Sequence, residues 1–452
     1  MKTSLSADIL TPILAYMRLE GQHKMILESI PRDKENARFS IVAYNPVYEI
    51  KFENGILTRN GKVIDADPLD YLQEFTGKHP VADAGPFSGG AIGFLGYDMI
   101  SLYENIGDIP VDPIGTPDMH FFIYESYLVF DHKKETISIH EDNIYSGRNE
   151  QEMASALEQV LQSLKQAHPA EFAPDDLHSL SFHNHLEKEE FEGMVTKAKE
   201  LIRQGDMFQC VLSQRFSAPI SGKPLDYYRN LRVTNPSNYL YFYDFGDYQI
   251  IGASPESLVS VKDGLVTTNP IAGTRPRGLD EEADKALAAD LLADQKEVAE
   301  HRMLVDLGRN DLGRIAQIGS VRVTKYMEVE LFRYVMHLTS IVKGQLLPEL
   351  SPLDALKSTL PAGTVSGAPK IRAMQRIYQL EKEKRGVYAG AIGYLSTSGD
   401  MDFAIAIRTM IIKNQMAYVQ AGAGIVYDSI PGNEYQETVN KAKAMTRIGD
   451  LP

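Results

Sequence analysis

The chain has 452 residues, of which 43% are hydrophobic and 24% charged, a composition that is ordinary for a globular protein. Its net charge of −15 disfavours nucleic acid as a partner, because non-specific binding requires Lys and Arg to neutralise phosphates. No apolar run approaches the roughly 20 residues that span a bilayer, and the single Cys210 excludes an internal disulfide. We therefore expect a cytoplasmic protein with no membrane partner.

The first part of the chain predicts strands and turns. Asn-Gly pairs at 54–55 and 60–61 indicate two hairpins. The segment FFIYESYLVFDHKKETISIHE predicts two strands around a His-Lys-Lys turn. Gly90, Gly93 and Gly96 recur at a spacing of three, which favours close backbone packing and does not fit a nucleotide-binding fingerprint.

Residues from about 148 to 166 predict an amphipathic helix, and the polar, Pro-containing stretch after it is the best candidate for a linker. We therefore divide the chain into an N-terminal region, 1–166, and a second region, 185–452. The second region alternates helices, including one over 285–310, with strands, including one over 401–413. The mixed order predicts an α+β fold, a sandwich of largely antiparallel sheets flanked by helices.

Two pairs of glutamates are candidate metal ligands. Glu297 and Glu300, and likewise Glu434 and Glu437, are three residues apart on predicted helices, so each pair projects from one face. Oxygen-only ligands of this kind suit Mg²⁺. The alternative is that both pairs lie on solvated helix faces.

Other patterns have a plain structural interpretation beside a functional one. The segment LPAGTVSGAPKIRAM runs into a helix near Pro369, and such a start offers N–H groups to an anion, although it is not a phosphate-binding P-loop. His337 lies in an apolar strand, where a buried structural histidine is the usual explanation. Tyr388 and Arg408 also lie in predicted apolar strands, and a charge on a half-buried strand needs a partner or a ligand.

Together these segments resemble the chorismate-binding enzymes, and most closely the anthranilate synthase component I group. The resemblance covers roughly 200 to 445. It is carried by the ordered segments GDMFQCVLSQRF, GASPESLV, PIAGTRPRG, KEVAEHRMLVDLGRNDLGR, VMHLTS, LPAGTVSGAPKIRAM, GAIGY, FAIAIRT and AGAGIVYDSIPGNEYQETVNKA.

The resemblance implies a Mg²⁺ ion that binds the ring carboxylate of chorismate through Glu300 and Glu437, with Glu297 and Glu434 as a second pair acting through water or hydrogen bonds. It implies that His337 transfers a proton near the leaving C4 hydroxyl while ammonia attacks C2. Pyruvate is then eliminated and the ring becomes aromatic. The remaining residues that match substrate-site positions of the family are Gln209, Gly273, Thr274, Thr364, Tyr388, Arg408, Gly422, Gly424 and Lys441.

Two positions discriminate among the family's reactions. Members that add water carry a lysine base where this chain has Gln209, and a neutral amide cannot deprotonate water. Aminodeoxychorismate synthases usually carry a lysine where this chain has Ala272. Both residues favour an anthranilate synthase, with aminodeoxychorismate synthase component I of folate synthesis as the alternative. A catalytically idle regulatory subunit and a Mg²⁺-dependent phosphotransferase are weaker alternatives.

The resemblance also implies a partner and an effector. Cys210 has no glutaminase context, so we expect a separate glutamine amidotransferase subunit to supply ammonia. Feedback inhibition by L-tryptophan is expected at a site in the N-terminal region and the segment NPSNYLYF. The matching residues are Glu28, Ser29, Asn235, Pro236 and Tyr239, with Asn238 in place of the family's usual proline.

Overall fold

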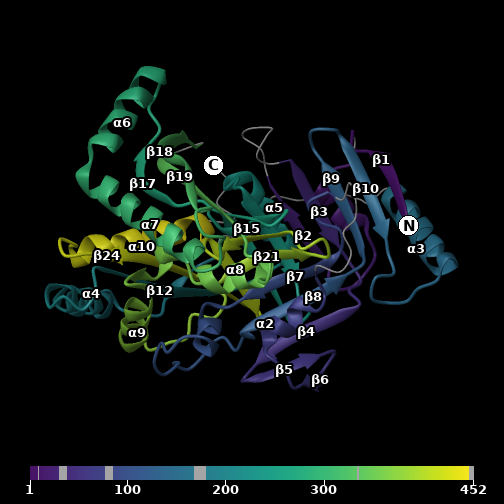
Figure 1. Ribbon diagram of the computed structural model, residues 1–452, viewed down its shortest axis with the longest axis horizontal. Helices are drawn as coiled ribbons and strands as arrows, with labels where there is room; N and C mark the ends of the chain where they lie inside the picture. The colour runs from purple at the N-terminus through teal and green to yellow at the C-terminus, as the bar shows by residue number, and fades with distance from the viewer. Residues whose placement is uncertain (9, 30–37, 77–84, 167–179, 333–334, 447–452) are drawn as a thin grey trace.

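Two antiparallel sheets packed face to face form the centre of the protein, and the helices cover their outer surfaces (Figure 1). The computed structural model describes residues 1–8, 10–29, 38–76, 85–166, 180–332 and 335–446. Within these residues each sheet contains 12 strands. The antiparallel α+β sandwich expected from the sequence is thus confirmed.

The two sheets are called sheet 1 and sheet 2. In order across sheet 1, the strands are β1 (Lys2–Ser6), β10 (Thr136–Glu141), β9 (Ser126–Asp131), β3 (Phe39–Ala43), β2 (Met25–Glu28), β13 (Tyr239–Asp244), β14 (Tyr248–Ser254), β23 (Thr409–Lys413), β24 (Met416–Ile425), β12 (Gln209–Pro219) and β11 (His183–Asn184), with β20 (Gly367–Ala368) also paired to β12. In order across sheet 2, they are β17 (Ile271–Pro276), β19 (Val335–Gln345), β16 (Leu265–Thr268), β15 (Ser257–Lys262), β22 (Met401–Ile405), β21 (Ala391–Ser396), β7 (Gly90–Leu95), β8 (Met119–Tyr124), β4 (Tyr48–Glu53), β5 (Ile56–Arg59) and β6 (Lys62–Ile64), with β18 (Arg322–Leu331) also paired to β19.

The helices pack outside the sheets. They are α1 (Pro12–Arg18), α2 (Pro68–Gln73), α3 (Glu150–Lys165), α4 (Lys188–Arg203), α5 (Pro224–Thr234), α6 (Glu281–Ala293), α7 (Gln295–Gly313), α8 (Pro352–Thr359), α9 (Lys370–Glu381), α10 (Pro431–Thr446) and the 3₁₀ helices η1 (Tyr97–Leu102) and η3 (Gly363–Val365). No helix in the described ranges combines the length and hydropathy needed to cross a bilayer.

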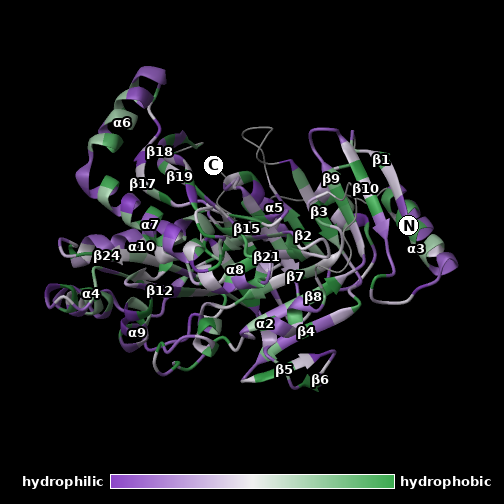
Figure 2. Cartoon of the chain, viewed as in Figure 1, coloured by the Kyte–Doolittle hydropathy of each residue, from purple (hydrophilic) through white to green (hydrophobic). Residues whose placement is uncertain are grey.

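The alternation of side chains in β13 shows how the layers form. Tyr241 and Tyr243 point into the space between the sheets, where they pack with Ile392 of sheet 2. Leu240 and Phe242 point the other way and pack under the outer helices. This period of two is what an antiparallel strand buried on both faces requires, and Figure 2 shows hydrophobic residues gathered along the central strands.

Both predicted regions contribute strands to both sheets. In sheet 1, β2 pairs with β13, and in sheet 2, β7 pairs with β21. The boundary between 1–166 and 185–452 stays a prediction, and most of the expected linker, 167–179, lies outside the described residues. What the pairing establishes is that strands of the two regions share one hydrogen-bonded framework.

Several segments expected to be single strands are divided where the chain passes from one sheet to the other. The prediction of one strand over 401–413 was wrong, because β22 belongs to sheet 2 and β23 to sheet 1. The prediction of one strand before the His-Lys-Lys turn was wrong in the same way, since β8 ends before Glu125 and β9 begins after it. A chain that changes sheets must break its ladder of hydrogen bonds, and hydropathy alone does not reveal this break.

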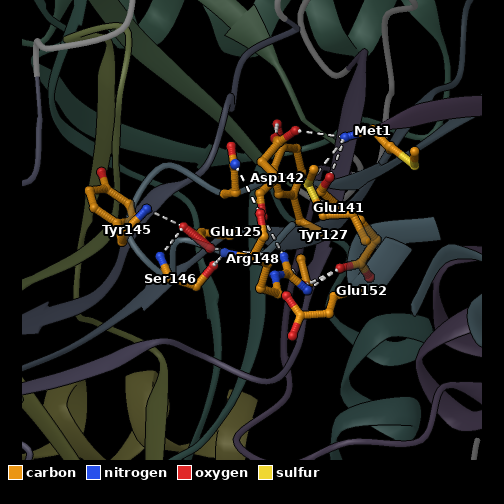
Figure 3. Close-up of polar contacts among 12 residues, drawn as sticks. Met1, Glu125, Tyr127, Glu141, Asp142, Tyr145, Ser146, Arg148 and Glu152 are labelled. Carbon is orange, nitrogen blue, oxygen red and sulfur yellow. Dashed lines mark hydrogen bonds and ion pairs between the residues drawn. The ribbon is translucent and has the colours of Figure 1, made fainter. Parts of the chain in front are cut away.

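Glu125 shows how such a crossing is held. Its buried carboxylate accepts hydrogen bonds from the backbone N–H groups of Tyr145 and Ser146. The guanidinium of Arg148 lies 3.9 Å away and also pairs with the buried Glu141 at 2.8 Å (Figure 3). One arginine therefore balances two buried carboxylates, which would otherwise be costly to bury.

Local sequence signals account for most of the other boundaries. Both Asn-Gly hairpins are confirmed, with Asn54 and Asn60 at positive φ. The predicted helix over 285–310 is two helices, because Asp294 ends α6 and then caps α7 by accepting from the N–H groups of Lys296 and Glu297. An aspartate at this position stabilises the start of a new helix.

Close packing at Gly93 predicts a large loss of stability on substitution. A Cβ at this residue would lie 2.1 Å from the carbonyl oxygen of His120 on the neighbouring strand. Gly93→Ala should therefore lower the free energy of unfolding by about 2 kcal/mol or more, measured by urea denaturation. Gly193→Ala is the control, since nothing lies within 4 Å of its added Cβ on α4, and it should raise stability by about 0.5–1 kcal/mol. Equal effects of the two would contradict this account.

Candidate active site

The candidate active site forms where two strands cross between the sheets side by side. The segment between β14 and β15 contains Glu256, and the segment between β22 and β23 contains Arg408. The two crossings bond to each other: the N–H of Ala253 donates to the carbonyl of Arg408, and that of Ile405 to the carbonyl of Glu256, each at 3.0 Å. Arg408 has a φ of 48°, an uncommon conformation for a non-glycine residue that marks constrained sites.

The charges at these crossings perturb each other. Burial raises the pKa of Glu256 to about 7, against the lowering effects of the Thr364 hydroxyl, Lys441 and Arg408. Arg408 is an exposed residue, and it lines the cavity beside it. Burial lowers its pKa and Glu256 raises it. Among the described residues, no hydrogen bond or ion pair occupies this guanidinium, so it is available to an anion.

His337 is held by a bulge in the neighbouring strand. The register of β17 and β19 shifts between Ala272 and Thr274, which places Gly273 at a φ of 68° in the bulge. The Nδ1 of His337 lies 2.8 Å from the carbonyl oxygen of Gly273 and 3.1 Å from the Thr274 hydroxyl. Because a carbonyl only accepts, Nδ1 carries the proton and Nε2 keeps its lone pair.

The electrostatics favour a neutral His337. Burial lowers the pKa of its imidazole, Arg408 lowers it further, and the hydrogen bond to Gly273 together with Glu330 raises it. A neutral ring with Nδ1 occupied can accept a proton or a hydrogen bond through Nε2. The expectation that His337 lies in a strand is confirmed. Beyond packing, its ring can also take part in proton transfer.

The four predicted metal ligands lie at the starts of α7 and α10. Burial raises the pKa of Glu297, and the nearby Glu300 and Asp294 raise it further. Burial also raises the pKa of Glu434, with Glu437 adding to the effect and Ser429, Lys296 and Lys441 opposing it. The influence of Lys296 on Glu434 shows that the two helix starts are close in space.

These carboxylates suit a hard cation, but they are not gathered into one coordination sphere. Within the described ranges, no three acidic, histidine or cysteine side chains stand together as a metal site. Glu437 instead forms an ion pair with Lys441 at 2.7 Å, and Glu300 accepts from the Gln209 amide at 3.2 Å. A cation here would need further oxygen ligands from a bound molecule.

Glycines bring side chains close to β24. The ammonium of Lys441 donates to the carbonyl oxygen of Gly422 at 3.1 Å. A Cβ at Gly422 would lie 2.9 Å from the hydroxyl of Tyr388, and one at Gly424 would lie 2.8 Å from the amide nitrogen of Gln209. Larger residues would therefore displace both side chains. The Oε1 of Gln209 is buried and has no hydrogen-bond partner in the described part of the chain, which leaves it open to a ligand.

A cavity of about 890 Å³ connects several of these groups. Predicted site residues along its wall are Asn235, Pro236, Thr274, His337, Arg408, Glu437 and Lys441. Thr364 lies beside Glu256 at η3. Tyr388 and Arg408 were expected within strands, and that was wrong: Tyr388 lies in the turn before β21, and Arg408 at the crossing before β23.

The five residues expected to bind an effector are divided between two cavities. Glu28, Ser29 and Tyr239 line a second cavity of about 540 Å³, whereas Asn235 and Pro236 line the first. The two cavities share part of their walls, which consists of Asn238, Pro255 and Phe332.

Glu256 is the functional candidate that the sequence interpretation missed. It lies in the segment GASPESLV, and its spacing from other polar residues does not mark it as a site residue. The available signal was a Pro-Glu pair directly after an apolar strand, where a carboxylate with a neighbouring proline interrupts the β pattern. Its raised pKa depends on residues from distant parts of the chain and was not readable from its neighbours.

Comparisons with known proteins agree with one another. The model of the chorismate binding enzyme family matches residues 23–447. Anthranilate synthase component 1 of Lactococcus lactis is 54% identical over 449 residues, covering 98% of each chain. The crystal structure of anthranilate synthase component I from Streptococcus pneumoniae has 71% identity and a TM-score of 0.88, covering 98% of this chain and 99% of that one. The menaquinone-specific isochorismate synthase of Escherichia coli shares the fold, with 20% identity and a TM-score of 0.77 over 100% of this chain and 94% of its own.

The Glu256 carboxyl should titrate near neutrality. In ¹³C spectra of protein labelled at the glutamate carboxyl carbon, one signal should have a pKa of about 7, well above the value of about 4.3 for exposed glutamates. Glu256→Gln should remove that signal alone. Titration of every glutamate below about pH 5 would contradict the proposed burial of this carboxyl.

Proposed function

The chain belongs to the chorismate-binding enzyme family, and we propose that it is the component of anthranilate synthase that converts chorismate and ammonia to anthranilate and pyruvate in tryptophan synthesis. The observation that carries this proposal is that two cations lie on the wall of one cavity: the available guanidinium of Arg408 and the ammonium of Lys441. Chorismate has two carboxylates, and this cavity offers a cation for each.

The substrate is bound by complementary charge and by exposed backbone. Arg408 suits the enolpyruvyl carboxylate, because a planar guanidinium can donate two parallel hydrogen bonds. Tyr388 completes this clamp. The small residues Gly422 and Gly424 let the ring carboxylate approach the backbone of β24, and Thr274 and Thr364 offer hydroxyls to the remaining oxygens.

Mg²⁺ is proposed to bind through Glu300 and Glu437, with Glu297 and Glu434 supporting them through water or hydrogen bonds. The mutual repulsion within the carboxylate pairs of α7 and α10 supports this assignment, and the ring carboxylate would supply further oxygens. When bound, the ion would neutralise that carboxylate and favour loss of the C4 hydroxyl. Lys441 would have to release Glu437 as the ligand binds.

Proton transfer is assigned to one proton donor and one proton acceptor. As the C2–N bond forms and the C4–O bond breaks, the leaving hydroxyl needs a proton, and Glu256 with its pKa of about 7 suits a donor. His337 was expected to act near that hydroxyl. Its neutral ring, with the lone pair on Nε2, suits proton acceptance, and aromatisation requires loss of the C2 proton as pyruvate departs.

Gln209 supports ammonia as the nucleophile. Its amide cannot deprotonate water, and its unpartnered Oε1 can accept a hydrogen bond from an N–H group. The ammonia is proposed to come from a separate glutamine amidotransferase subunit, component 2, with ammonium salts as a substitute. A cytoplasmic location also stays a prediction.

The test is to mix the purified chain with chorismate, Mg²⁺ and ammonium and to follow anthranilate fluorescence. The chain contains no Trp, so the protein background is low. A rising signal is expected. A non-aromatic amino product would instead assign the chain to the folate branch, and no consumption of chorismate would overturn the proposed catalytic role.

Removing one charge from the metal site should weaken both metal binding and turnover. Glu300→Gln and Glu437→Gln should each raise the Mg²⁺ concentration needed for chorismate binding by about 10- to 100-fold, measured by equilibrium dialysis without ammonium. Glu189→Gln, an exposed glutamate on α4, is the matched control and should change nothing. Unchanged Mg²⁺ dependence in the two site variants would overturn the metal assignment.

Feedback inhibition is proposed to act through the second cavity. Glu28, Ser29 and Tyr239 line it together with other aromatic side chains, which suits an indole ring and an amino acid backbone. Glu28 is already paired with Arg232 and accepts from the Tyr228 hydroxyl at 2.6 Å. Its carboxylate therefore has a fixed position, and Ser29 is left as the more adaptable polar contact.

Ser29→Ala should weaken L-tryptophan binding by about fivefold or more through loss of one hydrogen bond, with the uninhibited rate unchanged. Binding can be followed by the fluorescence of L-tryptophan itself, since the protein has none. Ser181→Ala, at an exposed residue, serves as the control. Persistence of full inhibition in the Ser29 variant would place the effector elsewhere.

A further inference from the structure

One arginine beside the candidate active site is completely enclosed by the protein. The side chain of Arg385 is 0% exposed, and it forms an ion pair at 2.6 Å with Glu381, four residues earlier at the end of α9. Its Nε also donates to the second oxygen of that carboxylate at 2.9 Å. A buried ion pair is weak evidence for stability, because an apolar pair of similar volume is often equally stable or more stable. The contacts of Arg385 instead indicate a role in fixing positions.

The other donors of Arg385 bind two fixed parts of the backbone. Its Nη1 donates to the carbonyl of Val365 in η3, and its Nη2 to the carbonyl of Val211 in β12, each at 2.7 Å. Glu381 in turn accepts from the backbone N–H and the hydroxyl of Ser213, at 2.7 and 3.0 Å. The ion pair therefore joins α9, β12 and η3 into one framework.

From this framework Arg385 supports the ring of Tyr388. Its guanidinium carbon lies over the Tyr388 ring, 5.6 Å from the centroid, and over the Tyr97 ring, 4.6 Å from the centroid. Both distances are within the range of cation–π attraction. Because the guanidinium contacts the face of the Tyr388 ring, the hydroxyl at the edge of that ring is left for another partner.

The Tyr388 hydroxyl lies at the wall of the candidate active site. It lies against β24, where a Cβ at Gly422 would be 2.9 Å from it, and the carbonyl of Gly422 accepts from the cavity residue Lys441. Within the described ranges, no hydrogen bond occupies this hydroxyl. Burial raises the pKa of Tyr388, an effect that Arg385 opposes. The hydroxyl therefore keeps its proton at neutral pH and can donate it to a carboxylate in a hydrogen bond.

The turn that carries Tyr388 has a conformation that needs support. Gly386 and Ala389 have φ values of 61° and 63°, and this left-handed conformation is unfavourable for alanine. Such strain persists only where the surrounding contacts determine the conformation. The N–H of Gly386 donates to the buried carboxylate of Asp98 at 2.7 Å, which fixes the start of the turn. Arg385 then fixes the side chain that the turn presents.

We propose that Arg385 is a positioning residue, which holds the Tyr388 hydroxyl where the enolpyruvyl carboxylate of chorismate binds. This inference rests on the proposed function and adds the residue that fixes one half of the carboxylate clamp. Arg408, the other half, is fixed independently by its backbone bond to Ala253. Arg385 acts through the Tyr388 ring and not on the reacting atoms. Its loss should therefore weaken chorismate binding and leave the use of ammonia unchanged.

The experiment removes the ion pair in two ways. Arg385→Met leaves the Glu381 carboxylate buried and unpaired, so it should lower both the urea midpoint and the affinity for chorismate. The double variant Glu381→Gln/Arg385→Met removes both charges, and its amide oxygen can still accept from Ser213, so most of the lost urea midpoint should return. Its dissociation constant for chorismate, measured by equilibrium dialysis with Mg²⁺ and without ammonium, should stay about tenfold or more above that of the starting protein.

Arg385→Lys keeps the charge beside Glu381 but loses the planar fork of donors. It should raise the KM for chorismate by about fivefold or more, because a flexible ammonium cannot hold both the framework and the Tyr388 ring. The KM for ammonium should stay within about twofold. An equal rise in both KM values would contradict a role confined to the carboxylate clamp.

Arg148→Met is the matched control, because Arg148 also balances buried carboxylates, at the crossing between β8 and β9, and contacts no candidate site residue. It should lower the urea midpoint but keep the dissociation constant for chorismate within about twofold. Two results would overturn the inference: return of chorismate affinity together with the urea midpoint in the double variant, or an equal loss of affinity in Arg148→Met. Failure of the unaltered protein to bind chorismate would instead overturn the proposed function.

Discussion

The active site depends on the side-by-side passage of two chain segments from one sheet to the other. A strand that leaves its sheet must give up its ladder of hydrogen bonds, and the freed backbone groups need new partners. The segments of Glu256 and Arg408 provide these partners for each other, through reciprocal bonds of 3.0 Å from Ile405 and Ala253. As a result, a carboxylate and a guanidinium from residues 152 positions apart in the chain are fixed in one place.

The passage between the sheets also determines the charge properties of Glu256 and Arg408. A loop at the surface would leave Glu256 solvated and ionised, whereas a crossing between two packed sheets buries it and raises its pKa to about 7. Arg408 is near enough to moderate the shift, and its own guanidinium is left for an anion. The carboxylate pairs of α7 and α10 add negative charge at the neighbouring side of the site. Repulsion within each pair makes a bound cation favourable there, since binding relieves that repulsion.

The sequence indicated the chemistry of the site better than it indicated how the fold builds the site. Helix periodicity and Asn-Gly turns gave α3 and the first hairpins because these depend on neighbours in the chain. The spacing of Glu297 and Glu300 fixed their common face for the same reason. The sheet crossings at Glu125 and Arg408 were not predicted, because an apolar run reads as one strand whichever sheet each half joins. Glu256 was missed as a candidate because its pKa depends on Thr364, Lys441 and Arg408, which are distant in sequence.

The same architecture connects the proposed effector cavity with the proposed proton-transfer groups. Pro255 lines both cavities and directly precedes Glu256, and Asn238 and Phe332 complete the shared wall. Phe332 also packs edge-on against the His337 ring, with centroids 5.2 Å apart. A molecule that filled the second cavity and moved this wall would therefore displace Glu256 and His337, the proposed proton donor and acceptor, together. Since catalysis requires both at fixed distances from the substrate, a small shift of one shared wall is sufficient to couple the two cavities.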